Sequence, residues 1–174
     1  PGDHDFLLAE TTPAGAFVGA IHFPGPNTDS CYDVIWTSTN KIVVTGISSQ
    51  YHIPNGDLFI AQFNGATPPP TLPNWERVCT SGDGSIGTAV TETTFPLYPG
   101  FVVTGPIWGV SGAGNEDILV AKFDPLGTFV WATVLVGPGA DCSTSVIELS
   151  TGDIVITGWT TSFGAGLKDL LIAK

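Results

Sequence analysis

Oxygen-bearing side chains recur through the chain in pairs whose spacing would suit a metal ion. Aspartates at positions 5, 57, 117 and 169 each begin a short apolar run, and in three of the four cases a second oxygen donor lies two residues earlier. The predicted calcium ligands are therefore Asp3, Asp5, Asn55, Asp57, Asn115 and Asp117, because Ca²⁺ prefers clustered carboxylate and amide oxygens. The fourth run has Leu167 before Asp169 and breaks the pattern. A second interpretation is that each aspartate accepts backbone N–H groups of the Gly-rich loop that enters its own apolar run.

Five tryptophans could provide stacking faces for a sugar ligand. Trp108 and Trp159 lie in Gly-rich stretches that we expect to be loops, where amphipathic rings can bind glycans or pack against neighbouring units. Trp36, Trp75 and Trp131 lie on expected strands, and we expect them to pack between neighbouring units of the fold.

Catalytic chemistry has little support in the sequence. The histidines, His4, His22 and His52, occupy non-equivalent positions, and neither a Gly-x-Ser-x-Gly elbow nor a paired-carboxylate motif is present. General acid–base catalysis needs such groups converging in a cleft. We therefore expect a protein that is not an enzyme and has no catalytic residues.

Composition limits the partners and the location of the chain. Acidic residues number 16 against 5 basic ones, for a net charge of -11, which disfavours nucleic acid as a partner. No apolar run approaches the roughly 20 residues of a membrane span. The absence of Met and a composition rich in Thr, Ser, Gly and Pro favour a secreted, extracellular or cell-surface protein.

The three cysteines, Cys31, Cys79 and Cys142, are odd in number and include no closely spaced pair. That spacing argues against a zinc or thioredoxin-like site, and at most one internal disulfide can form. The remaining thiol could be buried, free, or shared with another chain.

The four Asp-led runs are internal repeats over residues 5–10, 57–64, 117–124 and 169–174. The first and third repeats align without a gap at an offset of 112 residues, the difference between positions 117 and 5. The middle repeat is longer, and its extra residues, such as those at 67–70, fall where loops are expected. A period of this length is typical of stacked or radial repeat architectures.

Each repeat contains four strand candidates separated by turn residues. The first strands are expected over 32–38, 87–94 and 143–150, and the second over 42–46, 101–105 and 154–158. The Asp-led runs form the third strands, and the fourth include Trp75, Trp131 or residues 17–23. No segment shows helical periodicity. Recurring Thr-Gly pairs at 45–46, 104–105 and 157–158 end the second strands, where they could line a channel or allow close packing.

Four short strands in about 50 residues are typical of a β-propeller blade. The predicted fold class is therefore all-β, a β-propeller of about three four-stranded blades within a single repeat region, residues 1–174. The expected blades are 1–30 (partial, last two strands), 31–86, 87–140 and 141–174 (partial, first three strands).

Residues 112–162 also match a known repeat pattern: Gly112-Ala-Gly114, Asp117, Ala121-Lys122, Asp124-Pro-Leu-Gly127, Gly137-Pro-Gly139, Asp141 and Thr157-Gly-Trp-Thr160. In these motifs the chain resembles the bacterial SBBP-type β-propeller repeats, which are similar to NHL-type blades. The resemblance implies a propeller fold and an extracellular or cell-surface setting. It implies no particular activity, because the family has none in common.

Three blades are fewer than the 4 to 8 that typically close a propeller. We therefore expect other copies of the chain, or adjoining blades of a longer chain, to complete a ring, filament or surface layer. The assembly edges would be Asp5 to Glu10 and Asp169 to Lys174, joined by strand addition. The alternative functions are a glycan-binding or adhesive module, with or without calcium, and a piece of an enzyme whose active residues lie elsewhere.

Overall fold

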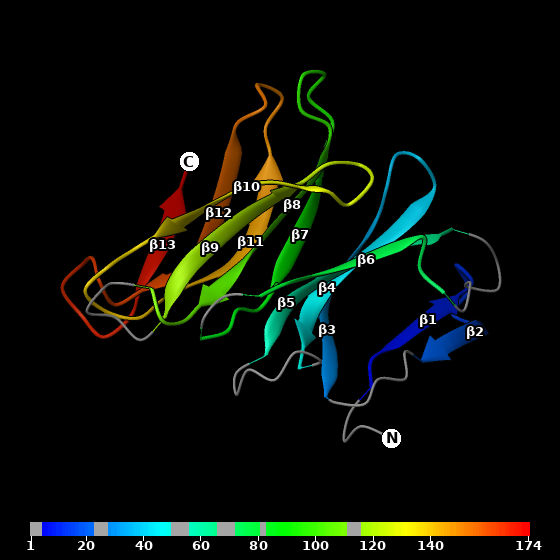
Figure 1. Cartoon of the computed structure of the whole chain (residues 1–174), viewed down its shortest axis with the longest axis horizontal. Coiled ribbons are helices and arrows are strands. Elements are labelled where there is room, and N and C mark those ends of the chain that lie inside the picture. Colours follow the sequence, from blue (N-terminus) through cyan, green and yellow to red (C-terminus); the bar gives the residue numbers. More distant parts are fainter. Residues whose placement is uncertain (1–4, 23–27, 50–55, 66–71, 81–82, 111–115) are drawn as a thin grey trace.

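The computed structural model describes residues 5–22, 28–49, 56–65, 72–80, 83–110 and 116–174, which form thirteen strands in four antiparallel sheets (Figure 1). No helix occurs within these ranges, so none there could span a membrane. The predicted all-β class is confirmed. No sheet closes on itself, and the propeller arrangement with its blade boundaries stays a prediction.

The sheets contain two, four, four and three strands in chain order. The first sheet has the order β1-β2, the second β3-β4-β5-β6, the third β10-β9-β8-β7 and the fourth β11-β12-β13. The bounds are β1 (Leu7–Thr11), β2 (Phe17–His22), β3 (Asp29–Trp36), β4 (Lys41–Ser48), β5 (Asp57–Asn64), β6 (Trp75–Cys79), β7 (Ala89–Thr93), β8 (Gly100–Ile107), β9 (Asp117–Phe123), β10 (Phe129–Leu135), β11 (Asp141–Glu148), β12 (Ile154–Thr160) and β13 (Asp169–Ala173).

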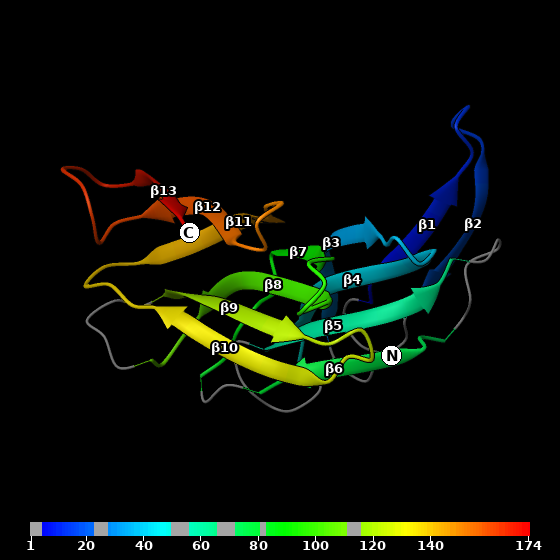
Figure 2. The same cartoon turned by 90° about the horizontal axis from the view of Figure 1, so that it is seen from above.

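The sheets follow one another across the molecule, with β1 and β2 at one end and β11 to β13 at the other (Figure 2). β7, the first strand of the third sheet, contacts the first strands of both neighbouring sheets, β3 and β11. We refer to the β1–β2 sheet and the β11–β13 sheet as the two end sheets.

Three hydrophobic cores fill the spaces between consecutive sheets. The core between the first and second sheets includes Phe6, Ile21 and Phe63. The core between the second and third sheets includes Leu58 and Phe123. A third core lies between the third and fourth sheets. Every inner sheet is therefore covered on both faces.

Burial on both faces explains why the central strands are apolar runs rather than alternating patterns. Successive side chains of a strand point to opposite faces. In β9, Ile118 and Val120 pack toward the fourth sheet, whereas Leu119 and Ala121 pack toward the second. A strand between two sheets is therefore expected to be mainly apolar on both faces, as the four residues after Asp57 and after Asp117 are.

The pairing register recurs from sheet to sheet. The threonine of each Thr-Gly pair lies opposite the third residue after the marker aspartate, as in Thr45↔Ile60, Thr104↔Val120 and Thr157↔Ile172. The ladders of β3 and β11 also shift register at aligned positions, after Cys31 and after Ser143. A fixed register allows positions in different sheets to be compared directly.

Candidate functional site

The marker aspartates hold loops in place where the structure describes their contacts. Asp117 is buried at the start of β9, and its Oδ1 accepts the Gly137 N–H at 3.0 Å from the loop between β10 and β11. Asp57 is buried at the start of β5. Asp117 therefore accepts a loop N–H, but from the loop between β10 and β11 rather than from the Gly-rich loop that enters β9, where residues 111–115 lie outside the described residues.

The predicted calcium pairs cannot be assembled from the described residues. Asp3, Asn55 and Asn115 lie outside them. Within the described ranges, no group of three or more His, Cys, Asp or Glu side chains converges. Calcium binding at Asp5, Asp57 and Asp117 stays a prediction.

A denser carboxylate network surrounds Asp141, which the sequence indicated only as part of a repeat motif. Its Oδ1 accepts hydrogen bonds from Thr160 Oγ1 at 2.5 Å and from the Thr161 N–H at 3.2 Å, and its Oδ2 accepts one from Ser162 Oγ at 2.6 Å. The carboxylate is buried. Because its described partners are hydroxyls and amides of its own sheet, Asp141 fixes the end of the β11–β12 pair.

Two glutamates tie consecutive sheets together. Glu92 on β7 accepts hydrogen bonds from the Ser38 N–H at 2.7 Å and the Ser38 hydroxyl at 2.8 Å, in the turn between β3 and β4. Glu148 on β11 accepts the Thr94 N–H at 2.7 Å and the Phe95 N–H at 3.2 Å, after β7. Each glutamate therefore joins its sheet to a turn of the preceding one. The sequence feature that could have indicated these residues is that Glu92 and Glu148 occupy aligned positions in two repeats.

The Thr-Gly pairs are packing features. Thr104 Oγ1 lies 2.9 Å from the Leu119 carbonyl oxygen and 2.7 Å from Ser143 Oγ of the next sheet. A Cβ on Gly105 would lie 1.9 Å from the Ile86 carbonyl oxygen. The glycine thus permits a close approach between β8 and the segment before β7 that no other residue allows, which supports the packing interpretation.

Lys122 is a buried cation, which in the sequence is visible only as part of the Ala121-Lys122 motif. Its ammonium group donates to the Thr93 hydroxyl and to the Tyr98 carbonyl oxygen, the latter at 2.9 Å. Burial lowers the pKa of this lysine. Its partners belong to β7 and the turn that follows, so Lys122 stabilises its own sheet.

The two predicted glycan-binding tryptophans are both half-buried. Trp108 directly follows β8, and its backbone N–H donates to the Gly84 carbonyl oxygen at 3.0 Å. The prediction that Trp159 lies in a loop is wrong, because it pairs with Cys142 and Leu170 inside β12. The Lys168 ammonium lies 3.5 Å from the centroid of the Trp159 ring. Glycan binding at these residues stays a prediction.

The expectation that Trp36, Trp75 and Trp131 all pack between sheets holds for only one of them. Trp75 packs in the core between the second and third sheets, with its ring centroid 5.9 Å from that of Phe101. Trp36 is 60% exposed and Trp131 is 41% exposed. Trp75 is covered by the turn at Gly127, between β9 and β10. Trp131 lacks such a cover because the fourth sheet has no fourth strand.

The cysteines are free, half-buried thiols in the structure. Burial, with a smaller contribution from Asp29, raises the pKa of Cys31 to about 12. Burial and Asp57 together raise the pKa of Cys79 to about 11. Protonated thiols are poor nucleophiles and poor metal ligands, so these side chains act as small core residues at neutral pH.

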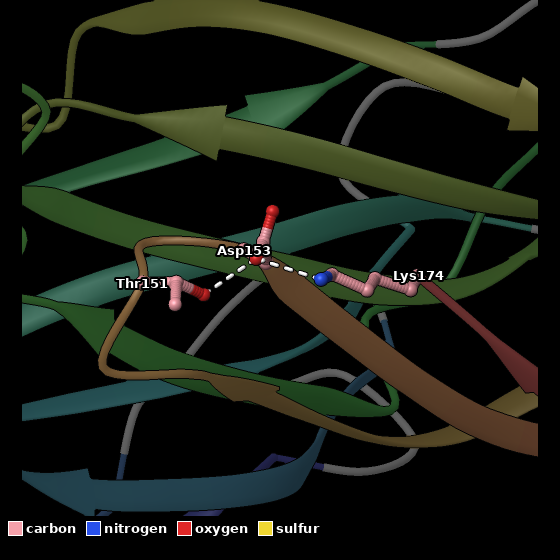
Figure 3. A network of polar contacts seen from close by, with 3 residues as sticks. All are labelled: Thr151, Asp153 and Lys174. Atoms are coloured by element: carbon pink, nitrogen blue, oxygen red, sulfur yellow. Dashed lines mark hydrogen bonds and ion pairs between the residues drawn. The ribbon is translucent and has the colours of Figure 1, made fainter.

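The predicted assembly edges lie on the outer strands of the two end sheets. Glu10 is within β1, Asp5 precedes it, and Asp169 opens β13. Lys174 forms a 2.8 Å ion pair with Asp153, which also accepts the Thr151 hydroxyl (Figure 3). The described part of β1 pairs with β2, and that of β13 pairs with β12.

The end sheets expose apolar side chains whose counterparts in the inner sheets are buried. Leu7 on β1 is 66% exposed, whereas the aligned Leu119 on β9 is 6% exposed. Ile172 on β13 is 64% exposed, whereas the aligned Val120 is 6% exposed. The solvent-facing sides of the end sheets thus carry apolar side chains at the positions that are buried between sheets in the interior.

These features define an all-β protein of consecutively packed antiparallel sheets, whose two end sheets expose apolar side chains at positions that are buried in the inner sheets. No family model matches the chain, and no curated protein matches it.

Proposed function

We propose that this chain is a non-enzymatic structural module, secreted or displayed at the cell surface. Its sheets would be propeller blades, and other copies of the chain would bind at its two end sheets to complete a ring, filament or surface layer. The observation that supports the proposal is the apolar surface at both ends.

The exposed positions indicate what they are suited to contact. Leu119 and Val120 are covered by the second and fourth sheets respectively. Leu7 and Ile172 occupy the aligned positions on end sheets. A sheet of the same kind is therefore the surface that fits them. Burying one leucine or isoleucine side chain contributes about 1.5–3 kcal/mol, so several such positions can support association.

Charge governs the conditions under which assembly is expected. Each chain has a net charge of -11, and copies of like charge repel one another at low ionic strength. Association driven by apolar surface is expected to strengthen as salt screens that repulsion.

The test is the mass of residues 1–174 in solution, measured by light scattering over a range of protein and salt concentrations, with electron microscopy of the same samples. The monomer mass is 18.1 kDa. Discrete larger species or regular fibres that increase with protein and salt are the expected result. A monomer at all concentrations up to the millimolar range would refute the proposal.

A further inference from the structure

The end sheets together contain one strand too many for a single four-stranded sheet. By alignment, β1 and β2 are a third and a fourth strand, and β11, β12 and β13 are a first, second and third. The third strand is therefore present at both ends. Both β1 and β13 are suited to the same place beside β12.

We propose, on the basis of the proposed function, that two copies of this chain associate by strand exchange. In the dimer, β1 of one copy replaces β13 of its partner beside β12. The joint sheet then has the order β11-β12-β1-β2, which is the order of the two complete sheets within each chain. The released β13 has no place in that sheet.

The side chains of β1 match those that β13 buries. Leu171 and Ala173 of β13 pack into the core between the third and fourth sheets. The aligned residues of β1 are Leu7 and Ala9, which are the same two residue types and are exposed. Exchange therefore places an identical leucine and alanine in that core. It also covers two residues of β1 that face solvent in the monomer.

The recurring register determines the pairing in the exchanged sheet. Gly158 and Thr157 lie opposite Leu171 and Ile172 in the monomer. Gly105 and Thr104 lie opposite Leu119 and Val120 in the third sheet, in the same register. The exchanged strand must therefore place Leu7 opposite Gly158 and Leu8 opposite Thr157.

β13 is only partly covered in the monomer. On β13, Leu170 is 78% exposed and Ile172 is 64% exposed. The ion pair between Lys174 and Asp153 joins two exposed side chains (Figure 3), and such pairs contribute little. The β1–β2 sheet instead buries Phe6 and Ile21 against the second sheet. Exchange preserves those contacts, because β1 and β2 stay packed on their own chain.

The exchanged dimer contains enough complete sheets to close a propeller ring. Twelve of the thirteen strands of each copy then form three complete sheets, so two copies provide six. Closed propellers have typically 4 to 8 blades. Two reciprocal exchanges related by a two-fold axis would give a ring of twice 18.1 kDa, about 36 kDa, with the symmetry most common among dimers.

The first test displaces β13 in the full chain with Leu171→Pro combined with Ile172→Pro. Neighbouring N–H groups of a strand point to opposite edges, so one of the two prolines removes a hydrogen bond to β12. Strand exchange predicts a dimer dissociation constant at least about tenfold lower, because β12 becomes available to the partner. An unchanged or weakened dimer would overturn the exchange, since it would show that β13 itself forms the contact.

A pair of matched surface variants tests the buried position of β1. Leu7→Asp places a charge where the exchanged strand is buried, whereas Leu97→Asp changes a leucine of similar exposure, 72% against 66%, in the turn between β7 and β8. Strand exchange predicts that Leu7→Asp raises the dissociation constant more than about tenfold and that Leu97→Asp leaves it unchanged. Equal effects of the two variants would overturn the exchange.

Disulfide trapping tests the register. A chain with Leu8→Cys is mixed with a chain with Thr157→Cys, and each variant alone is the control. Directly opposed cross-strand residues lie close enough to form a disulfide. A mixed disulfide dimer, mapped by mass spectrometry, is the expected product. If the mixture forms larger species but no disulfide between the two introduced thiols, the exchange is wrong and assembly by another contact stands. If no larger species form at all, both proposals fail.

Discussion

Gly105 lies where β8 and the segment before β7 approach closely, and it gives the sharpest prediction for the fold. Gly105→Ala adds one Cβ at 1.9 Å from the Ile86 carbonyl oxygen and 3.0 Å from the Thr88 backbone nitrogen. An ordinary contact between such atoms is more than 3.4 Å, so the strand must move by more than an ångström. Ile86 N–H and Thr88 N–H both donate to carbonyls of β8, at 3.0 and 2.8 Å. The movement must strain these bonds.

The expected magnitude follows from those two costs. Overpacking of a well-packed site costs about 1–3 kcal/mol, and one weakened hydrogen bond costs about 0.5–1.5 kcal/mol. Gly105→Ala should therefore lower the free energy of unfolding by about 2–4 kcal/mol. The measurement is urea denaturation followed by tryptophan fluorescence and circular dichroism.

The control is Gly166→Ala, whose added Cβ would meet only carboxylate oxygens of Asp169 at 3.9 Å or more. It should change stability by less than about 0.5 kcal/mol. Gly158→Ala has a similar clash with Cys142, but its end sheet is less buried and can relax, so its effect should be smaller than that of Gly105→Ala. A Gly105→Ala protein as stable as the control would refute the close approach of β8 to the segment before β7.

Three further measurements test the thiols, calcium and glycans. In the folded chain the pKa values of Cys31 and Cys79 are about 12 and about 11, whereas both thiols lose their protons near pH 9.0 in the unfolded chain. Above pH 9 only the unfolded chain is deprotonated, so the free energy of unfolding should fall by about 1.4 kcal/mol per thiol between pH 8 and pH 10. A Cys→Ser variant with the same fall would refute this. If calcium is structural, chelation should lower the melting temperature. An unchanged melting temperature would contradict a structural role for calcium. If the chain binds glycans, an immobilised glycan array should retain it and Trp108→Ala or Trp159→Ala should release it, whereas unchanged retention would contradict a role for these rings.

The central strands were predictable because a strand that is buried on both faces has a recognisable apolar run in the sequence. β5 and β9 are packed between two sheets and are mainly apolar on both faces, so an Asp-led apolar run marks each of them. The boundaries of the first strands were less accurate. β3 begins at Asp29 rather than Tyr32, because a shift in register after Cys31 interrupts the pattern on which the prediction relied.

The contacts between sheets were not predictable from patterns within one repeat. Glu92 and Glu148 bind turns more than 50 residues away in sequence, and nothing local to either glutamate indicates such a partner. The exposure of Trp131 also depends on a neighbour. Its aligned residue Trp75 is half-buried in a core, so the residue type alone does not decide whether the ring is covered.

The packing of each sheet against only its neighbours in sequence has a consequence for how such proteins change length. The cores lie between consecutive sheets, and the glutamate hydrogen bonds join a sheet to the one before it. Stability in such an array is a sum of local units and nearest-neighbour interfaces. Duplicating or deleting one repeat therefore leaves the remaining interfaces intact. The gene can gain or lose a sheet in a single recombination event without requiring a new hydrophobic core.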